Sequence, residues 1–286
     1  MLTSKVKKGI IAGCALTAGI ALSVVACDTR ITTANYSIST KKLNAPIRIV
    51  FISDLHNSLF GEGQSQIIDI VEKAKPDIVV IGGDIADKTQ SHYPENAYIL
   101  AHYLGKRYPC YYSMGNHEYS RGDSALIKQK LAGYGIKVLE GSGETLIVNG
   151  EEIEICGIFD ANGYFEKDGE LINELQAVTA EKDAERYRVL ISHFPEDVET
   201  CLTGNFDLIL SGHAHGGQWR IPGITEGIYA PGQGFFPKYV GGLYQHGETW
   251  QLVSRGLWKP STAIAIPRVF NRPELDIVDI TPEDAE

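Results

Sequence analysis

Short runs of β-branched and aromatic residues recur along the first part of the chain, and a stretch with helical spacing separates each run from the next. The runs span residues 48–52, 78–81 and 110–113, and the helical patterns between them span residues 66–75 and 95–107. Runs this short fit strands that are buried on both faces. Strands alternating with helices predict βαβ units and therefore an α/β fold. The same patterns continue as helices at 124–134 and 170–181 and as strands at 189–191, 208–210, 251–254 and 275–280.

The middle of the chain breaks this alternation with three short strand patterns, at residues 138–139, 145–148 and 153–158. An Asn-Gly pair at 149–150 separates the last two patterns, and this dipeptide favours the tight turn of a β-hairpin. No internal repeat and no second domain boundary is evident in the sequence. We therefore expect two packed sheets with helices outside them, formed by a single domain over residues 46–286.

The charge of the chain argues against binding to nucleic acid. Its 286 residues include 26 basic and 36 acidic side chains, which gives a formal net charge of −10. Surfaces that bind nucleic acid need an excess of Lys and Arg instead. Hydrophobic residues make up 43% of the sequence, which is enough for a large core. Five cysteines without a Cys-x-x-Cys spacing predict neither a disulfide framework nor a thiolate metal site.

The N-terminal 27 residues read as a targeting or anchoring segment. Lysines at positions 5, 7 and 8 precede residues 9–26, which carry no charged side chain. This run is just long enough to span a bilayer, and its end at Cys27 also resembles a lipoprotein processing site. A buried core helix is the third interpretation, although no polar residue gives the run a second face. Both favoured interpretations place the lysines in the cytoplasm and the rest of the chain outside. We therefore expect an extracytoplasmic domain that is tethered to the cell membrane. Residues 28–45 would form the linker between the membrane and this domain.

Clusters of polar residues follow five of the predicted strands. In open α/β sheets ligands bind beyond the carboxyl ends of the strands, so we expect these clusters to meet in one crevice. They contain imidazole, carboxylate and amide groups without thiolate, a combination that suits Mn, Fe or Zn. The clusters are Asp54-x-His56, Gly83-Asp84-x-x-Asp87, Gly115-Asn116-His117-Glu118, His193 and Gly212-His213-x-His215.

Each of these residues also has an ordinary structural interpretation when it is taken alone. A single histidine such as His56 or His193 is more often a packed polar residue than a ligand, and Asp84 and Asn116 are common in turns. The complete series makes that interpretation unfavourable for the set. Residues 213 and 215 lie two apart, so an extended backbone would point both imidazoles to one side.

Taken together, in this order and after strands, the clusters resemble the signature of the calcineurin-like metallophosphoesterases. The resemblance extends over residues 47–280 and implies a four-layer α-β-β-α sandwich of two mixed sheets with a site for two divalent metal ions. It further implies which residues bind each ion. Asp54, His56 and His215 would hold the first metal, Asn116, His193 and His213 would hold the second, and Asp84 would bridge both.

The implied ligand set has a physical rationale. Two neighbouring cations repel each other, and a shared carboxylate such as Asp84 offsets that repulsion. The metals would activate water for attack on phosphorus and neutralise the phosphate oxygens. In the family, the histidine corresponding to His117 is not a ligand, so it would protonate or stabilise the leaving oxygen, with Asp87 orienting its ring. Glu118 follows the signature without an assigned role.

A closer resemblance is to a membrane-anchored bacterial branch of the family, whose members are similar to YkuE and YaeI. It depends on the N-terminal segment, on residues 212–218 and on the C-terminal stretches 254–257 and 271–274. The resemblance implies a lipid-linked phosphate as substrate, for example UDP-2,3-diacylglucosamine. Trp258 stands where the branch usually has glycine, and Arg255 could bind phosphate or form a structural ion pair.

Residues 219–244 are rich in glycine and aromatic side chains and follow the last predicted metal ligands. Phe235 and Phe236 could form a lip for an acyl chain, or the segment could be a packed loop that covers the sheet end. The expected activity is hydrolysis of a phosphoester or pyrophosphate bond. The alternatives are a phosphatase or phosphodiesterase for small soluble esters, a non-catalytic binding protein on the same fold, and a metal-dependent amidohydrolase.

Overall fold

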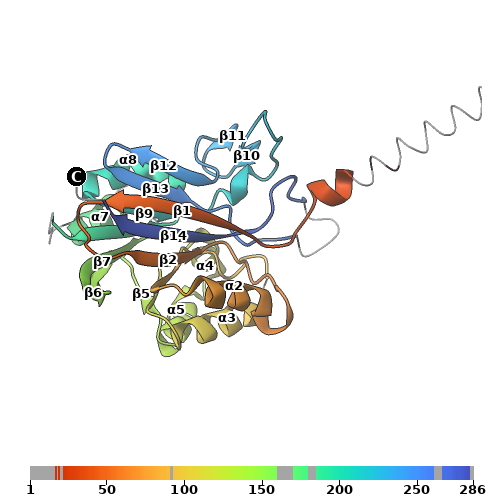
Figure 1. Ribbon diagram of the computed structural model, residues 1–286. Coiled ribbons are helices and arrows are strands. Elements are labelled where there is room, and N and C mark those ends of the chain that lie inside the picture. Colours follow the sequence, from red (N-terminus) through yellow and green to blue (C-terminus); the bar gives the residue numbers. More distant parts are fainter. Residues whose placement is uncertain are drawn as a thin grey trace, which may run out of the picture.

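The computed structural model describes residues 17, 19, 22–90, 93–159, 170–179, 185–260 and 266–283. Two six-stranded sheets pack face to face in it (Figure 1). The first sheet has the strand order β1-β14-β2-β3-β4-β5, and the second has the order β12-β13-β9-β8-β7-β6. The strands of the first sheet are β1 (Thr32–Thr40), β2 (Ile47–Ile52), β3 (Ile78–Ile81), β4 (Cys110–Tyr112), β5 (Lys137–Val138) and β14 (Glu274–Pro282). Those of the second are β6 (Ser142–Val148), β7 (Glu151–Ile158), β8 (Tyr187–Ser192), β9 (Leu208–Ser211), β12 (Gly242–His246) and β13 (Thr249–Val253).

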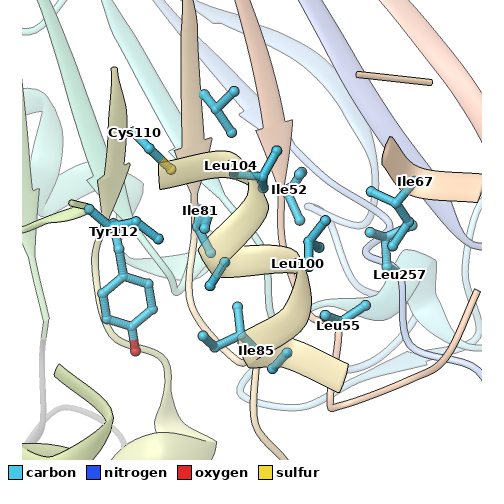
Figure 2. Packing of buried hydrophobic residues seen from close by; sticks show 14 of the residues in the cluster. Ile52, Leu55, Ile67, Ile81, Ile85, Leu100, Leu104, Cys110, Tyr112 and Leu257 are labelled. Carbon is cyan, nitrogen blue, oxygen red and sulfur yellow. The ribbon is translucent and has the colours of Figure 1, made fainter. Parts of the chain in front are cut away.

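Helices cover the outer face of each sheet. Against the first sheet pack α2 (Ser65–Ala74), α3 (Glu95–Gly105) and α5 (Ser124–Gly133), and Figure 2 shows Leu100 and Leu104 of α3 beside Ile52 and Ile81 of the strands. The second sheet is covered by α7 (Glu170–Thr179) and the short α8 (Val198–Cys201). A separate apolar cluster fills the space between the sheets. The predicted four-layer α-β-β-α sandwich of two mixed sheets is therefore confirmed.

The direction of the central strands determines where a site can form. In the first sheet β2, β3 and β4 are parallel neighbours, and in the second β7, β8 and β9 are parallel neighbours. Their carboxyl ends consequently meet at one end of the sandwich. β14 runs antiparallel to β2, which makes the first sheet mixed.

The predicted hairpin joins β6 and β7. Asn149 and Gly150 both have positive φ angles, 54° and 88°, as a tight turn with the favoured twist requires. Asn149 also donates hydrogen bonds to the carbonyl of Pro46 and to the Asp77 carboxylate. The turn is thereby tied to the start of β2 and to the residue before β3.

The segment predicted as a linker, residues 28–45, contains a strand. Residues Thr32–Thr40 form β1, which pairs in parallel with β14 along its whole length. The linker prediction was therefore wrong for these residues. The small side chains of β1 hide an alternation in which Ala34, Tyr36 and Ile38 face inward while the residues between them are exposed. β1 completes the sheet as an edge strand.

Most of the predicted N-terminal anchor lies outside the described residues. Its described end is helical over residues 22–26, and the amide of Phe270 donates a hydrogen bond to the Ala26 carbonyl. Within the part of the chain that the structure describes, no helix combines the length and the hydropathy needed to cross a bilayer.

Candidate metal centre

Loops at the carboxyl ends of five strands deliver the predicted ligands to one place. Three groups of side chains lie there. Within each group the ligand atoms are all within 4.8 Å of one another, which is close enough to surround an ion. The structure thus brings together the ligands that the sequence scatters over 162 positions, from Asp54 to His215. The groups are Asp54 with His56 and His215, His56 with Asp84 and His117, and Asp84 with His193 and His213.

The first group combines the loop after β2 with the loop after β9. Oδ1 of Asp54 lies 3.9 Å from Nε2 of His56 and 3.7 Å from Nε2 of His215. Ser53 Oγ and the backbone amide of His213 donate hydrogen bonds to the Asp54 carboxylate, which fixes its orientation. Three potential ligand atoms therefore converge in a site whose carboxylate is already held in place.

We call two of the three groups the first and the second group. The second is formed by His193 and His213 around Asp84, and it involves the loop after β8. Nδ1 of His193 is 2.6 Å from the carbonyl of Gly82, so this nitrogen carries the proton and donates it. Nε2 is left to face the site, where it lies 3.3 Å from Oδ2 of Asp84. The carbonyl therefore selects the tautomer that a metal ligand needs. Asn116 begins the helix α4 (Asn116–Arg121) next to these groups, and its Oδ1 is buried without a hydrogen-bond partner.

Asp84 lies between the two groups. Its Oδ1 accepts a hydrogen bond from the backbone amide of His117, whereas no backbone amide among the described residues donates to its Oδ2. This second oxygen is 3.3 Å from Nε2 of His193 and 3.7 Å from Nε2 of His56. One carboxylate oxygen thus faces imidazoles from both groups, which is the position that a bridging ligand occupies.

The backbone at the ligands is unusual. Five of the seven predicted ligands have positive φ angles between 47° and 63°, a conformation that costs non-glycine residues about 1–3 kcal/mol each. Such conformations persist only where the surrounding structure imposes them, and they gather at functional sites. The five residues are Asp54, His56, Asp84, His213 and His215.

Two glycines permit the close approach of these loops. Gly83 has φ 88°, and a Cβ atom built on it would lie 2.6 Å from the amide nitrogen of Gly115. A Cβ atom on Gly115 would lie 2.2 Å from Oδ1 of Asp84. A side chain at either position would force the β3 and β4 loops apart, so the glycines of the motif are steric requirements.

Burial and the Asp84 carboxylate determine the pKa values of the histidines. It lowers the pKa of His56 and of His213 to about 3, which leaves both imidazoles neutral, the form that binds a metal. Burial also opposes protonation of His193, but the Asp84 carboxylate outweighs it and raises the pKa of His193 to about 10. Without a cation, the proton on His193 takes the place of a positive charge beside Asp84.

The residues fit a metal ion on their chemistry. Buried polar atoms in folded proteins almost always have hydrogen-bond partners, and an unpartnered one costs about 1–3 kcal/mol. Several buried atoms of the predicted ligands have no such partner among the described residues. They are Nε2 of His56, Oδ2 of Asp84, Oδ1 of Asn116 and Nε2 of His193. Cations would satisfy these atoms at once, and the nitrogen and oxygen donor set suits Mn, Fe or Zn.

His117 faces the cluster from the start of α4. Its ring lies edge-on to that of His56, with centroids 4.3 Å apart. Nδ1 of His117 accepts a hydrogen bond from the amide of Lys88 and lies 3.5 Å from Oδ1 of Asp87. Burial lowers the pKa of His117, but the carboxylates of Asp87 and Asp84 more than offset this and raise it. The ring is therefore oriented through Nδ1 and can hold a proton on Nε2.

Two residues that the sequence left without a role position this part of the site. The buried carboxylate of Glu118 accepts hydrogen bonds from the amides of Asp84, Ala86 and Gly115, so it ties the β3 loop to the start of α4. The guanidinium of Arg121 donates to the carbonyl of Asp87 and pairs with Asp123. Glu118 lay within the motif, but only its contacts show what it does.

The predicted substrate-binding residues differ in their surroundings. Arg255 forms an ion pair with Glu274, which is the structural interpretation left open above. Phe235, in β11 (Gly234–Phe235), and Phe236 are 73% and 72% exposed. Trp258 packs edge-on against His215 with ring centroids 5.7 Å apart, so the unusual residue of this loop contacts a predicted ligand.

The sandwich and the cluster of imidazole and carboxylate groups at its strand ends define a metal-dependent hydrolase. A model of the calcineurin-like phosphoesterases matches residues 47–217, and the chain belongs to this family. The match covers every predicted ligand, the predicted proton donor His117 and Asp87, which was predicted to orient its ring. It makes the protein a phosphoester hydrolase.

Three relatives illustrate this membership. The chain is 29% identical to the phosphodiesterase YaeI of Escherichia coli, over 74% of this chain and 76% of that protein. It is 28% identical to the metallophosphoesterase YkuE of Bacillus subtilis, over 80% and 77%. It is also 28% identical to the metallophosphoesterase Cj0846 of Campylobacter jejuni, over 80% of this chain but 59% of that protein.

Proposed function

We propose that the chain is a phosphodiesterase or pyrophosphatase that uses two divalent cations. The observation that carries the proposal is Oδ2 of Asp84, which faces His193 from one group and His56 from the other. The name of the relative YaeI supports diester cleavage. The complete set of predicted ligands together with His117 favours catalysis over a purely binding role.

The side chains have distinct tasks in this proposal. Cations held by the two groups would act as Lewis acids and activate water near neutral pH. Asp84 supplies negative charge to both positions. Nε2 of His117 donates a proton to the leaving oxygen. Nδ1 faces the Asp87 carboxylate when the ring is protonated and accepts a hydrogen bond from the Lys88 amide when the ring is neutral. Ser53 and the His213 amide keep Asp54 in place.

Elemental analysis of the purified full chain, combined with hydrolysis of bis(4-nitrophenyl) phosphate, tests this proposal. We expect metal in the protein and loss of hydrolysis after treatment with a chelator, restored by Mn²⁺ or Zn²⁺. His193→Ala is expected to remove both metal and activity, whereas His102→Ala, which changes an exposed histidine on α3, leaves both intact. Activity that survives chelation and His193→Ala would refute the proposal.

We further propose that the substrate is a lipid-linked phosphate, such as a nucleotide-lipid pyrophosphate, hydrolysed at the outer face of the membrane. The exposed rings of Phe235 and Phe236 support this because exposed aromatic rings could contact an acyl chain. Replacing both by Ala should lower turnover of a nucleotide-lipid pyrophosphate more than turnover of the small diester. Equal losses on the two substrates would favour a small soluble ester instead.

A further inference from the structure

Exposed apolar side chains are concentrated on one part of the surface. Among the described residues, seventeen large apolar side chains are exposed, and ten of them lie in residues 22–25, residues 219–236 and Ile266. Isolated exposed apolar residues are ordinary, but a concentration of them marks an interaction surface. We call these three segments the apolar rim. Its exposed members are Leu22, Val24, Val25, Trp219, Ile221, Ile224, Tyr229, Phe235, Phe236 and Ile266.

Hydrogen bonds join the segments of the apolar rim. The indole nitrogen of Trp219 donates to the carbonyl of Pro267, and the amide of Arg220 donates to the carbonyl of Val269. The next residue, Phe270, donates its amide to Ala26 at the end of the N-terminal helix. Figure 1 shows this helix and the β10–β11 pair at the same end of the sandwich. Segments distant in sequence therefore form one continuous structure.

A buried residue, a ring contact and a hydrogen bond fix the backbone of the apolar rim. In the segment 219–236, Ala230 of β10 (Tyr229–Ala230) is buried in the cluster that covers the second sheet. The rings of Tyr229 and Phe235 contact each other with centroids 5.4 Å apart, and the amide of Phe236 donates to the carbonyl of Ile228. Ile224 is 80% exposed. The backbone is thus fixed by bonds while its largest apolar side chains face outward.

We propose that the apolar rim lies against the surface of a lipid bilayer. The chain that enters the rim at Ala26 belongs to the uncharged run of residues 9–26, which follows three lysines. An apolar segment of this kind and aromatic side chains at its exit are typical of membrane-associated proteins. In residues 219–236 of the apolar rim, the charged side chains are Arg220 and Glu226, which form an ion pair. Contact is therefore driven by apolar burial and does not require anionic lipid.

The rim also borders the metal centre. His215 begins the turn η4 (His215–Gly217), and Trp219 follows two residues after that turn ends. A phosphate at the surface of the bilayer would consequently lie beside the predicted ligands. Delivery of a lipid-linked substrate by this route rests on the proposed function, whereas contact with the bilayer does not.

Tryptophan reporters in the full chain test the contact. The protein is reconstituted in vesicles of brominated phosphatidylcholine, with and without phosphatidylglycerol, and bromine quenches only tryptophan that reaches the lipid. Ile224→Trp places a reporter on the rim. Ile147→Trp places one at an equally exposed position, 76%, on β6, which Figure 1 shows at the other end of the molecule. Emission added by each reporter is compared with that of the unsubstituted chain.

We expect emission from Ile224→Trp to be quenched several-fold more than emission from Ile147→Trp, with either lipid mixture. Equal quenching of the two reporters, weak or strong, would overturn the proposal. Shielding of Ile224→Trp from aqueous iodide without quenching by lipid would show that a protein covers the rim, and would also overturn it. Hydrolysis of the small diester by the unsubstituted chain, measured in parallel, shows separately whether the proposed activity holds.

Discussion

The two ends of strand β3 carry the same residue type in opposite situations. Asp77 precedes the strand, and its carboxylate accepts hydrogen bonds from the Arg48 amide and the Asn149 side chain. Asp84 follows the strand, and no backbone amide among the described residues donates to its Oδ2 although the residue is fully buried. Asp77 uses its charge to stabilise the fold. Asp84 leaves half of its capacity unused within the protein, which is what a ligand for a cation must do.

Substitution of Asp84 is expected to have the largest effect on the difference between the two ends of β3. We expect Asp84→Asn to reduce hydrolysis by about 10⁴-fold and to abolish metal binding, because the amide provides no charge for two cations. In the presence of a chelator the variant should be less stable to heat than the unsubstituted chain, because His193 loses the buried carboxylate that favours its proton. Metal content, diester turnover and thermal unfolding measure these effects. Metal content and turnover equal to those of the unsubstituted chain would contradict the role of Asp84 as a ligand.

A second substitution separates metal binding from proton transfer. His117→Ala should lower kcat by about 10²–10³-fold while the metal content stays unchanged, because the side chain acts on the leaving group. The loss should be larger for an alkyl phosphodiester than for a 4-nitrophenyl diester, whose leaving group needs no proton. Turnover of the two substrates measures this difference. Equal losses, or loss of metal, would contradict the assigned role.

Substitution of Glu118, at the same end of β3, is expected to have a smaller effect. Glu118→Gln replaces an acceptor of three backbone hydrogen bonds by a group with one acceptor oxygen, so the loops that carry Asp84 and Asn116 lose part of their support. We expect metal affinity to fall by about 10–100-fold, as for other groups that orient ligands. Titration of the metal-free protein with Mn²⁺ measures this. Unchanged affinity would limit Glu118 to a role in folding.

The smallest effect is expected at the opposite end of β3. Asp77→Ala removes the acceptor for Arg48 and Asn149 and should lower the free energy of unfolding by about 1–2 kcal/mol. Metal content and turnover per folded molecule should not change, because Asp77 lies at the end of the strand remote from the ligands. Denaturant unfolding and diester assays measure both. A loss of metal here would remove the distinction between the two ends.

Much of this arrangement follows from the sequence because strand direction and motif order act together. The residues Asp54, Asp84 and His193 each follow a parallel strand, so the fold places them at one edge. The left-handed backbone at Asp54 and Asp84 was not predictable, because aspartate is enriched in this conformation but most aspartates do not adopt it. The surrounding loops impose it. β1 was missed because its inward-facing residues include only one large aliphatic side chain, Ile38, among many polar ones.

The same strand β1 determines how far the domain can move from its N-terminal segment. Helical residues end at Ala26 and β1 begins at Thr32, so five residues with a contour length of about 17 Å connect them. The guanidinium of Arg272 donates hydrogen bonds to the carbonyls of Arg30 and Ile31, which restricts this connecting segment further. The helical residues that end at Ala26 and the domain that begins at β1 are therefore held close to each other.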